Sequence, residues 1–170
     1  MITRHLVASV LCALVCLANL PAHAEDLDTK KAAATVNGEA ITLADVAVAL
    51  PMADRTSAEA RQTALEKLID KTLLAQAARK LITKPNPEFV EERIQEIVKQ
   101  NFNGDNAAFE AELQKQGYTL EMFRKYHETE ILVQIMRREI AGAETNPVAR
   151  EQQLAEWLKT ARAEAKITYE

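Results

Sequence analysis

The sequence has few of the residues that usually carry catalytic or metal chemistry. Among its 170 residues are two cysteines and three histidines. Both cysteines, Cys12 and Cys16, lie in an apolar run near the N-terminus, and His127 is the only histidine beyond residue 24. Thiol catalysis, disulfide bonds and most zinc sites need more such ligands than this part of the chain offers. Glycine and proline are also scarce, with four and five copies, and they stand at the boundaries of predicted elements.

Residues 1–24 have the pattern of a secretory signal peptide. Arg4 and His5 precede an apolar run over residues 6–20, and small residues lead up to Ala24. A membrane anchor is the alternative, but a helix needs about 20 apolar residues to span a bilayer and this run is shorter. We expect cleavage after Ala24, no membrane insertion of the mature protein, and a flexible leader over residues 25–32.

The charge of the chain is mildly acidic and evenly spread. It has 21 Lys and Arg against 25 Asp and Glu, a net charge of −4. Because there is no basic cluster, we expect neither nucleic acid nor an anionic membrane as a partner. The sequence also has no glycine-rich phosphate loop and no Gly-x-Ser-x-Gly turn, so we expect no cofactor.

Two segments of the sequence are typical of β-strands. Residues 33–41 predict a hairpin, with Asn37-Gly38 as the two central residues of a type I′ turn. In that register Val36 faces Glu39 and Ala34 faces Ile41. Residues 166–169 predict a single strand at the C-terminus. Since a two-stranded hairpin alone is marginally stable, we expect the last strand to join the hairpin in one small sheet.

The sequence between these strands predicts about six helices, so the fold class is mainly α. Apolar residues recur at helical spacing, and Ser, Thr and Asn stand at the predicted helix starts. The fifth helix has an unusually wide apolar pattern, so we expect it to contact several other helices. Thr42 with Asp45 predicts a capping box for the first helix, and Pro51 its end. The predicted helices cover residues 43–50, 57–82, 87–103, 106–116, 119–141 and 146–165.

The pattern of polar residues favours a binding protein over an enzyme. His127 lies four residues from both Phe123 and Ile131, which predicts a packed, hydrogen-bonded histidine on a helix face rather than a general base. Carboxylate pairs such as Glu91-Glu92 are neighbours on solvated helix faces and do not oppose each other across a cleft. We therefore predict no catalytic residues and no metal ligands.

The remaining candidates are large or adaptable apolar side chains, which either fill the core or bind an apolar partner. Trp157 is one more side chain of this kind. The candidates for binding are Phe89, Phe102, Phe109, Met122, Tyr126 and Met136.

In the order of its segments the chain resembles the chaperone core of the SurA and PrsA group of exported folding factors. Residues 33–43 resemble the hairpin-to-helix opening of that group, and residues 64–78 resemble its long second helix. Residues 109–131 resemble its passage of a short helix, a glycine and a capped long helix. The resemblance covers residues 33–170 as a single domain and implies a periplasmic protein that binds unfolded or partly folded exported polypeptides.

The resemblance leaves three functions in competition. The first is an ATP-independent holdase, for which the six apolar side chains are candidates for client binding. The second is a residual peptidyl-prolyl isomerase. Relatives commonly carry a parvulin domain between the fifth and sixth helices; only residues 142–146 lie there, whereas a small domain needs roughly 100 residues. The third is a dedicated adapter for one exported partner. A homodimer is compatible with all three.

Overall fold

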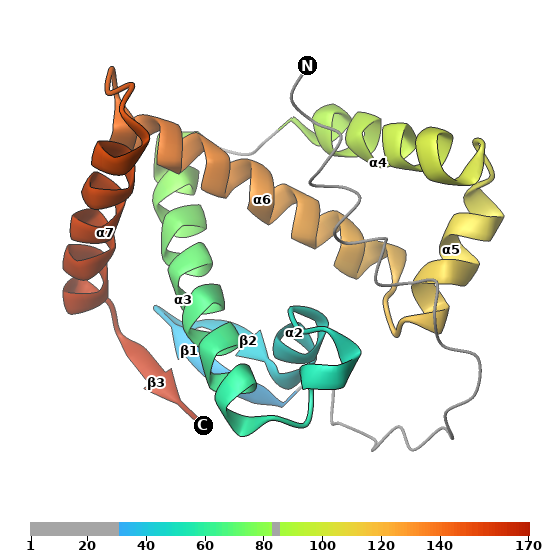
Figure 1. Ribbon diagram of the computed structural model, residues 1–170, viewed down its shortest axis with the longest axis horizontal. Helices are drawn as coiled ribbons and strands as arrows, with labels where there is room; N and C mark the ends of the chain where they lie inside the picture. Colours follow the sequence, from blue (N-terminus) through green and yellow to red (C-terminus); the bar gives the residue numbers. More distant parts are fainter. Residues whose placement is uncertain (1–30, 83–85) are drawn as a thin grey trace.

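The computed structural model describes residues 31–82 and 86–170 and shows a mainly α fold with a small sheet (Figure 1). The predicted signal peptide and residues 25–30 of the predicted leader lie outside the described residues. The strands are β1 (Ala32–Val36), β2 (Glu39–Thr42) and β3 (Ile167–Tyr169). The helices are α2 (Leu43–Val48), α3 (Ala58–Leu81), α4 (Pro87–Phe102), α5 (Asn106–Lys115), α6 (Leu120–Ala141) and α7 (Pro147–Glu164), with a short 3-10 helix at Met52–Asp54. The predicted fold class of six helices and one small sheet is confirmed.

The hairpin between β1 and β2 has the predicted turn and register. Asn37 and Gly38 have φ angles of 52° and 87°, as a type I′ turn requires at both central positions. Ala34 pairs with Ile41 and Val36 pairs with Glu39. The strands extend one residue further at each end than predicted, because Ala32 pairs with Thr42 beyond a bulge.

The C-terminal strand β3 joins this hairpin, and β1 is the central strand in the order β2-β1-β3. Val36 pairs with Ile167 and Ala34 pairs with Tyr169 in antiparallel register. Both Val36 and Ala34 are fully buried, at 0% exposure. The two ends of the described chain are therefore closed into one sheet.

Asn37 also links the turn to β3 and α3. Its backbone N–H donates to the Lys166 carbonyl at 2.8 Å, and its Oδ1 accepts from the Lys166 N–H at 2.9 Å. Its Nδ2 donates to Gln76 at 2.9 Å, and Gln76 in turn donates to the carbonyl of Val36 at 2.9 Å. The residue that sets the turn therefore also fastens the last strand and the hairpin to α3.

The helix starts follow from the capping residues in the sequence. Thr42 and Asp45 form the predicted capping box of α2. The helix ends at Val48, before the predicted end near Pro51, since the residue that precedes a proline disfavours the α conformation. The predicted caps of the longer helices are also present: Ser57, Asn86, Thr119 and Asn146 each accept a hydrogen bond from the first turn.

Among the described residues the core is divided into three apolar clusters, and α6 contributes to two of them. The first half of α6 packs with α4 and α5, whereas its second half packs with α3 and α7. The remaining cluster lies between the sheet, α2, the first half of α3 and part of α7. Figure 1 shows α6 as the link between α4–α5 on one side and α3, α7 and the sheet on the other. The expectation of several partners for this helix is confirmed, and its wide apolar pattern has this cause.

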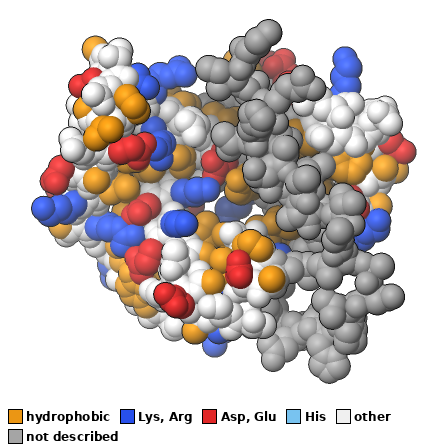
Figure 2. All heavy atoms as spheres, viewed as in Figure 1, with side chains coloured by type: hydrophobic (Ala, Val, Ile, Leu, Met, Phe, Trp, Pro, Cys, Tyr) orange, Lys and Arg blue, Asp and Glu red, His pale blue; other side chains and the backbone are white. Residues whose placement is uncertain are grey.

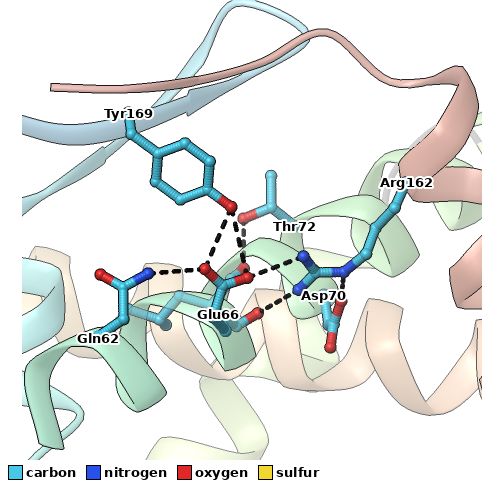
Figure 3. A network of polar contacts seen from close by, with 7 residues as sticks. Gln62, Glu66, Asp70, Thr72, Arg162 and Tyr169 are labelled. Atoms are coloured by element: carbon cyan, nitrogen blue, oxygen red, sulfur yellow. Dashed lines mark hydrogen bonds and ion pairs between the residues drawn. The ribbon is translucent and has the colours of Figure 1, made fainter. Parts of the chain in front are cut away.

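Arg162 of α7 and Tyr169 of β3 converge on Glu66 of α3 (Figure 3). The Arg162 guanidinium donates to the Glu66 carboxylate at 2.8 Å, to the Glu66 carbonyl at 3.0 Å and to Asp70 at 2.6 Å. The Tyr169 hydroxyl donates to Glu66 at 3.1 Å. Burial alone would raise the pKa of the Glu66 carboxyl, but these hydrogen bonds and the charge of Arg162 outweigh it and lower that pKa. We refer to Glu66, Asp70, Arg162 and Tyr169 as the Arg162 cluster.

Candidate functional site

Five rings form a continuous aromatic chain from the interior to the surface. Phe102, Phe109, Phe123 and His127 follow one another with centroid distances of 5.4, 5.2 and 4.5 Å, and Tyr126 meets His127 at 5.4 Å. All four contacts are edge-to-face, a geometry worth about 0.5–1.5 kcal/mol per pair beyond burial. Phe109 is 4% exposed and Tyr126 is 46% exposed. The chain therefore connects the α4–α5–α6 cluster to a surface ring on α6.

Tyr126 faces α3 and is held there by a cation and an ion pair. The Lys71 Nζ lies 5.5 Å from the centre of the Tyr126 ring, close enough for a cation–π contact. Lys71 also pairs with Glu130, one turn further along α6. Burial, and then the charge of Glu130, raise the pKa of the Tyr126 hydroxyl. The side chain therefore stays neutral and presents an apolar ring with a hydrogen-bonding tip.

A groove beside Tyr126 lies between the end of α2 and the first half of α3. Lys71 lines this groove, and its Nζ lies near the Tyr126 ring, so the groove and the ring share this one side chain. Its walls combine small and branched apolar side chains with charges of both signs. The lining residues are Ala49, Leu50, Ser57, Glu59, Ala60, Thr63, Ala64, Lys67, Leu68 and Lys71. In Figure 2, too, acidic, basic and apolar side chains are interspersed over the face of α3 and α7.

A tyrosine just before α6 links the end of α2 to the rest of the molecule. The Tyr118 hydroxyl donates to the carbonyl of Val48 at 2.9 Å, and the Tyr118 ring packs on the α4–α5–α6 cluster. Burial raises the pKa of this hydroxyl, which therefore remains a donor. The end of α2 is thus supported from both α3 and the segment that precedes α6.

The six predicted binding residues do not form one surface. Phe109 and Met136 are 4% and 8% exposed and belong to two different core clusters. Phe102 is half-buried against the cluster of Phe109. In this conformation these three side chains pack in the interior, so the candidate site does not include them. At these positions helical periodicity identified the apolar face of the helix, and the protein's own core covers that face.

The other three candidates are more accessible. Tyr126 lies beside the groove, Met122 is half-buried one turn earlier on α6, and Phe89 is 61% exposed on α4. Phe89 does not belong to the α4–α5–α6 cluster. Trp157 is half-buried between the sheet cluster and the α3–α6–α7 cluster. Client binding by any of the six side chains stays a prediction.

Sequence reasoning missed the groove residues Leu50 and Leu68 as a possible binding surface. Leu68 was part of the predicted apolar stripe of the second helix, and Leu50 of the first. No signal in the sequence shows how these two short stripes meet, because a linker joins the helices and sets no angle between them. The apolar stripes that contain Leu50 and Leu68 were the one feature of the sequence that indicated a possible binding surface there.

His127 is packed as predicted. Its ring lies between Phe123 and Tyr126 and is half-buried. Burial, and secondarily the charge of Arg93 on α4, lower the pKa of the imidazole against the opposing effect of Glu130. The predicted hydrogen bond to the ring is not found among the described residues. Nor do these residues contain a group of acidic, histidine or cysteine side chains able to hold a metal ion.

The fold and this groove define the class of protein: a mainly helical module with a small closing sheet and a partly apolar recess beside an exposed aromatic ring. The family profile described as SurA-like N-terminal domain matches residues 2–137. The chain belongs to this family. The match ends within α6, so α7 and β3 lie beyond the matched residues. No curated protein matches the chain. In the part of the chain that the structure describes, every helix is too short or too polar to cross a membrane.

Proposed function

We propose that the protein is an exported, ATP-independent chaperone that holds non-native polypeptides in the groove between α2 and α3, against Tyr126. The observation that carries this proposal is that Lys71 both lines the groove and lies over a half-exposed aromatic ring, in a chain of the SurA-like N-terminal domain family. The predicted signal peptide supports a periplasmic location.

The groove has the chemistry that loose binding of varied chains requires. The partly buried side chains of Leu50 and Leu68 and the Tyr126 ring offer apolar surface, and Lys67 and Lys71 line the groove beside them. Contacts of this kind give modest affinity without a covalent step. Binding then acts by mass action, because any protein that binds the unfolded state lowers the concentration of free, aggregation-prone chains.

The test measures light scattering from a chemically denatured model client diluted into buffer. We expect the purified protein in severalfold excess to reduce scattering, and Tyr126→Ser to remove most of that effect. The matched control is Val148→Ser on α7, which alters an apolar side chain with 65% exposure outside the groove. No suppression by the wild-type protein would refute the holdase. Equal loss in the control would refute the groove as its site.

The same preparation distinguishes a holdase from a prolyl isomerase. A holdase acts in proportion to its amount, whereas an isomerase accelerates proline-limited refolding at trace concentration. We propose that this protein gives no such acceleration. Faster refolding at a ratio of one protein to many clients would contradict the proposal. Stoichiometric capture of one exported partner, without general suppression of aggregation, would favour an adapter.

A further inference from the structure

The strand β3 has an open edge. It stands at one end of the sheet and pairs only with β1 among the described residues. The Lys166 carbonyl accepts from the turn after β1 at 2.8 Å, and the Glu170 N–H donates to β1 at 3.1 Å. Because backbone groups alternate between the two edges of an antiparallel strand, the N–H and C=O groups of Ile167 and Tyr169 point away from β1. In Figure 1 β3 lies at the rim of the molecule.

The opposite edge of the sheet, on β2, is less available. The Thr42 N–H already donates to the Asp45 carboxylate at 2.8 Å, and the chain continues directly into α2. Thr168 and Tyr169 of β3 are exposed instead. Since unpaired backbone groups on an exposed edge are a template for another strand, the sheet can be extended at β3.

The sequence around β3 is complementary to a second copy of itself. In an antiparallel pairing centred on Thr168, Lys166 faces Glu170 of the second copy, and Ile167 faces Tyr169 of the second copy. Opposite charges, an aromatic ring with a β-branched side chain, and two threonines are all favourable cross-strand pairs. Parallel pairing would put Lys166 opposite Lys166, and an antiparallel shift by two residues would lose both charge pairs. One register therefore satisfies all positions.

We propose that the free edge of β3 binds a second copy of this chain, so that the sheets of the two copies become one continuous antiparallel sheet. The side chains of Lys166 and Glu170 are exposed and form no ion pair with a described residue, so they can pair across the interface. A three-residue strand gives a small interface, and the dimer is accordingly weak and reversible. This association does not depend on the proposed holdase activity.

Sedimentation velocity from low micromolar to near-millimolar concentration tests the association. We expect a concentration-dependent dimer that Lys166→Glu or Glu170→Lys weakens severalfold, because each change puts like charges opposite each other at both ends of the interface. An equimolar mixture of these two variants restores opposite charges and should associate like the wild type. Lys159→Glu and Glu156→Lys, with 79% and 78% exposed side chains on α7, are the matched controls and should change nothing. A monomer at all concentrations, or no rescue in the mixture, would overturn the proposal.

A disulfide tests the register without changing a charge. The two Thr168 residues would form a non-hydrogen-bonded pair with Cα atoms about 4.5 Å apart, which suits a disulfide. With Cys12 and Cys16 replaced by serine, Thr168→Cys should cross-link under mild oxidation, whereas Thr160→Cys on the exposed side of α7 should not. Equal cross-linking of the two variants would overturn the proposal. So would a chain that stays monomeric and gains amide protection at Tyr169 only when an extended client peptide is added, because the edge would then bind clients.

The outcomes for the dimer and for the holdase are distinguishable. Suppression of light scattering by a monomeric protein would leave the proposed function standing and overturn the β3 interface. A dimer that responds to the charge variants as expected, in a protein without any effect on scattering, would support the interface alone.

Discussion

Replacement of Arg162 by methionine should show how strongly the C-terminal segment holds the fold together. Methionine keeps an unbranched apolar stem and removes all three hydrogen bonds to Glu66 and Asp70. These two carboxylates lie four residues apart on α3, where like charges repel each other by about 0.2–0.5 kcal/mol. The variant therefore loses the bonds between α7 and α3 and also leaves this repulsion uncompensated.

The size of the effect follows from the exposure of the groups. The side chains of Arg162, Asp70 and Glu66 keep 30%, 31% and 36% exposure, so water screens their attraction and partly replaces the lost bonds. We therefore count each bond at about 0.5–1 kcal/mol, nearer to surface pairs than to buried ones. The free energy of unfolding should fall by about 2 kcal/mol, which for a chain of this size lowers the melting temperature by roughly 4–8 °C.

The pH dependence of this loss identifies its cause. The pKa of Glu66 is lowered in the folded protein by the hydrogen bonds of Arg162 and Tyr169, although burial opposes them. A lowered carboxyl pKa contributes stability above the unfolded value, near 4.5, and that contribution is lost as the pH falls through the folded value. The difference in melting temperature between wild type and Arg162→Met should thus be largest near neutral pH and shrink below pH 4.5.

Thermal unfolding followed by circular dichroism at several pH values measures both quantities. Arg137→Met is the matched control, because Arg137 pairs with Glu151 between α6 and α7 with 40% and 65% exposure of the two side chains. Its unfolding free energy should change by less than about 0.5 kcal/mol. If Arg162→Met lowers the free energy of unfolding no more than this control, or by an amount that does not depend on pH, the Arg162 cluster does not stabilise the contact of α7 and β3 with α3.

Two further predictions concern the sheet and the core. Deletion of residues 166–170 should remove exchange protection from the amides of Thr35 and Asn37, because these amides point towards β3 in the antiparallel ladder. The amide of Val36 points towards β2 and should stay protected. Residue-resolved hydrogen exchange measures the three amides, and equal protection or equal loss at all of them would contradict the prediction. Phe109→Ala should lower the free energy of unfolding by about 3–5 kcal/mol and Phe89→Ala by less than about 0.5 kcal/mol, since the two side chains are 4% and 61% exposed. Denaturant unfolding measures both changes. Similar losses of stability in the two variants would contradict the burial of Phe109.

The parts of the fold that sequence reasoning predicted depend on local chemistry. Asn37-Gly38 permits positive φ at two consecutive positions, and a two-residue turn then fixes the pairing of Val36 with Glu39. Thr42 and Asp45 likewise determine the start of α2 within one turn. The return of the last strand was predicted for a different reason, since a lone hairpin is marginally stable and one further strand was available.

The parts that were not predicted depend on contacts between distant residues. Arg162 meets Glu66 across 96 positions of sequence, and nothing distinguishes it from the other charged residues on helix surfaces. The second role of Asn37, as a partner of Lys166 and Gln76, is equally invisible in the turn motif. Periodicity likewise assigned an apolar face to each helix without indicating whether the protein covers it.

Neighbouring positions of α6 separate the closed interior from the candidate site. Phe123 packs against the cluster of α4 and α5, whereas Tyr126 and Glu130 meet Lys71 of α3. A change at Phe123 therefore disturbs the core and the support of the site together. A change at Tyr126, which is 46% exposed, alters the surface ring and leaves the cluster intact. Binding and stability can consequently be varied independently at Tyr126 but not at Phe123, which makes Tyr126 the position where the proposed function is tested most cleanly.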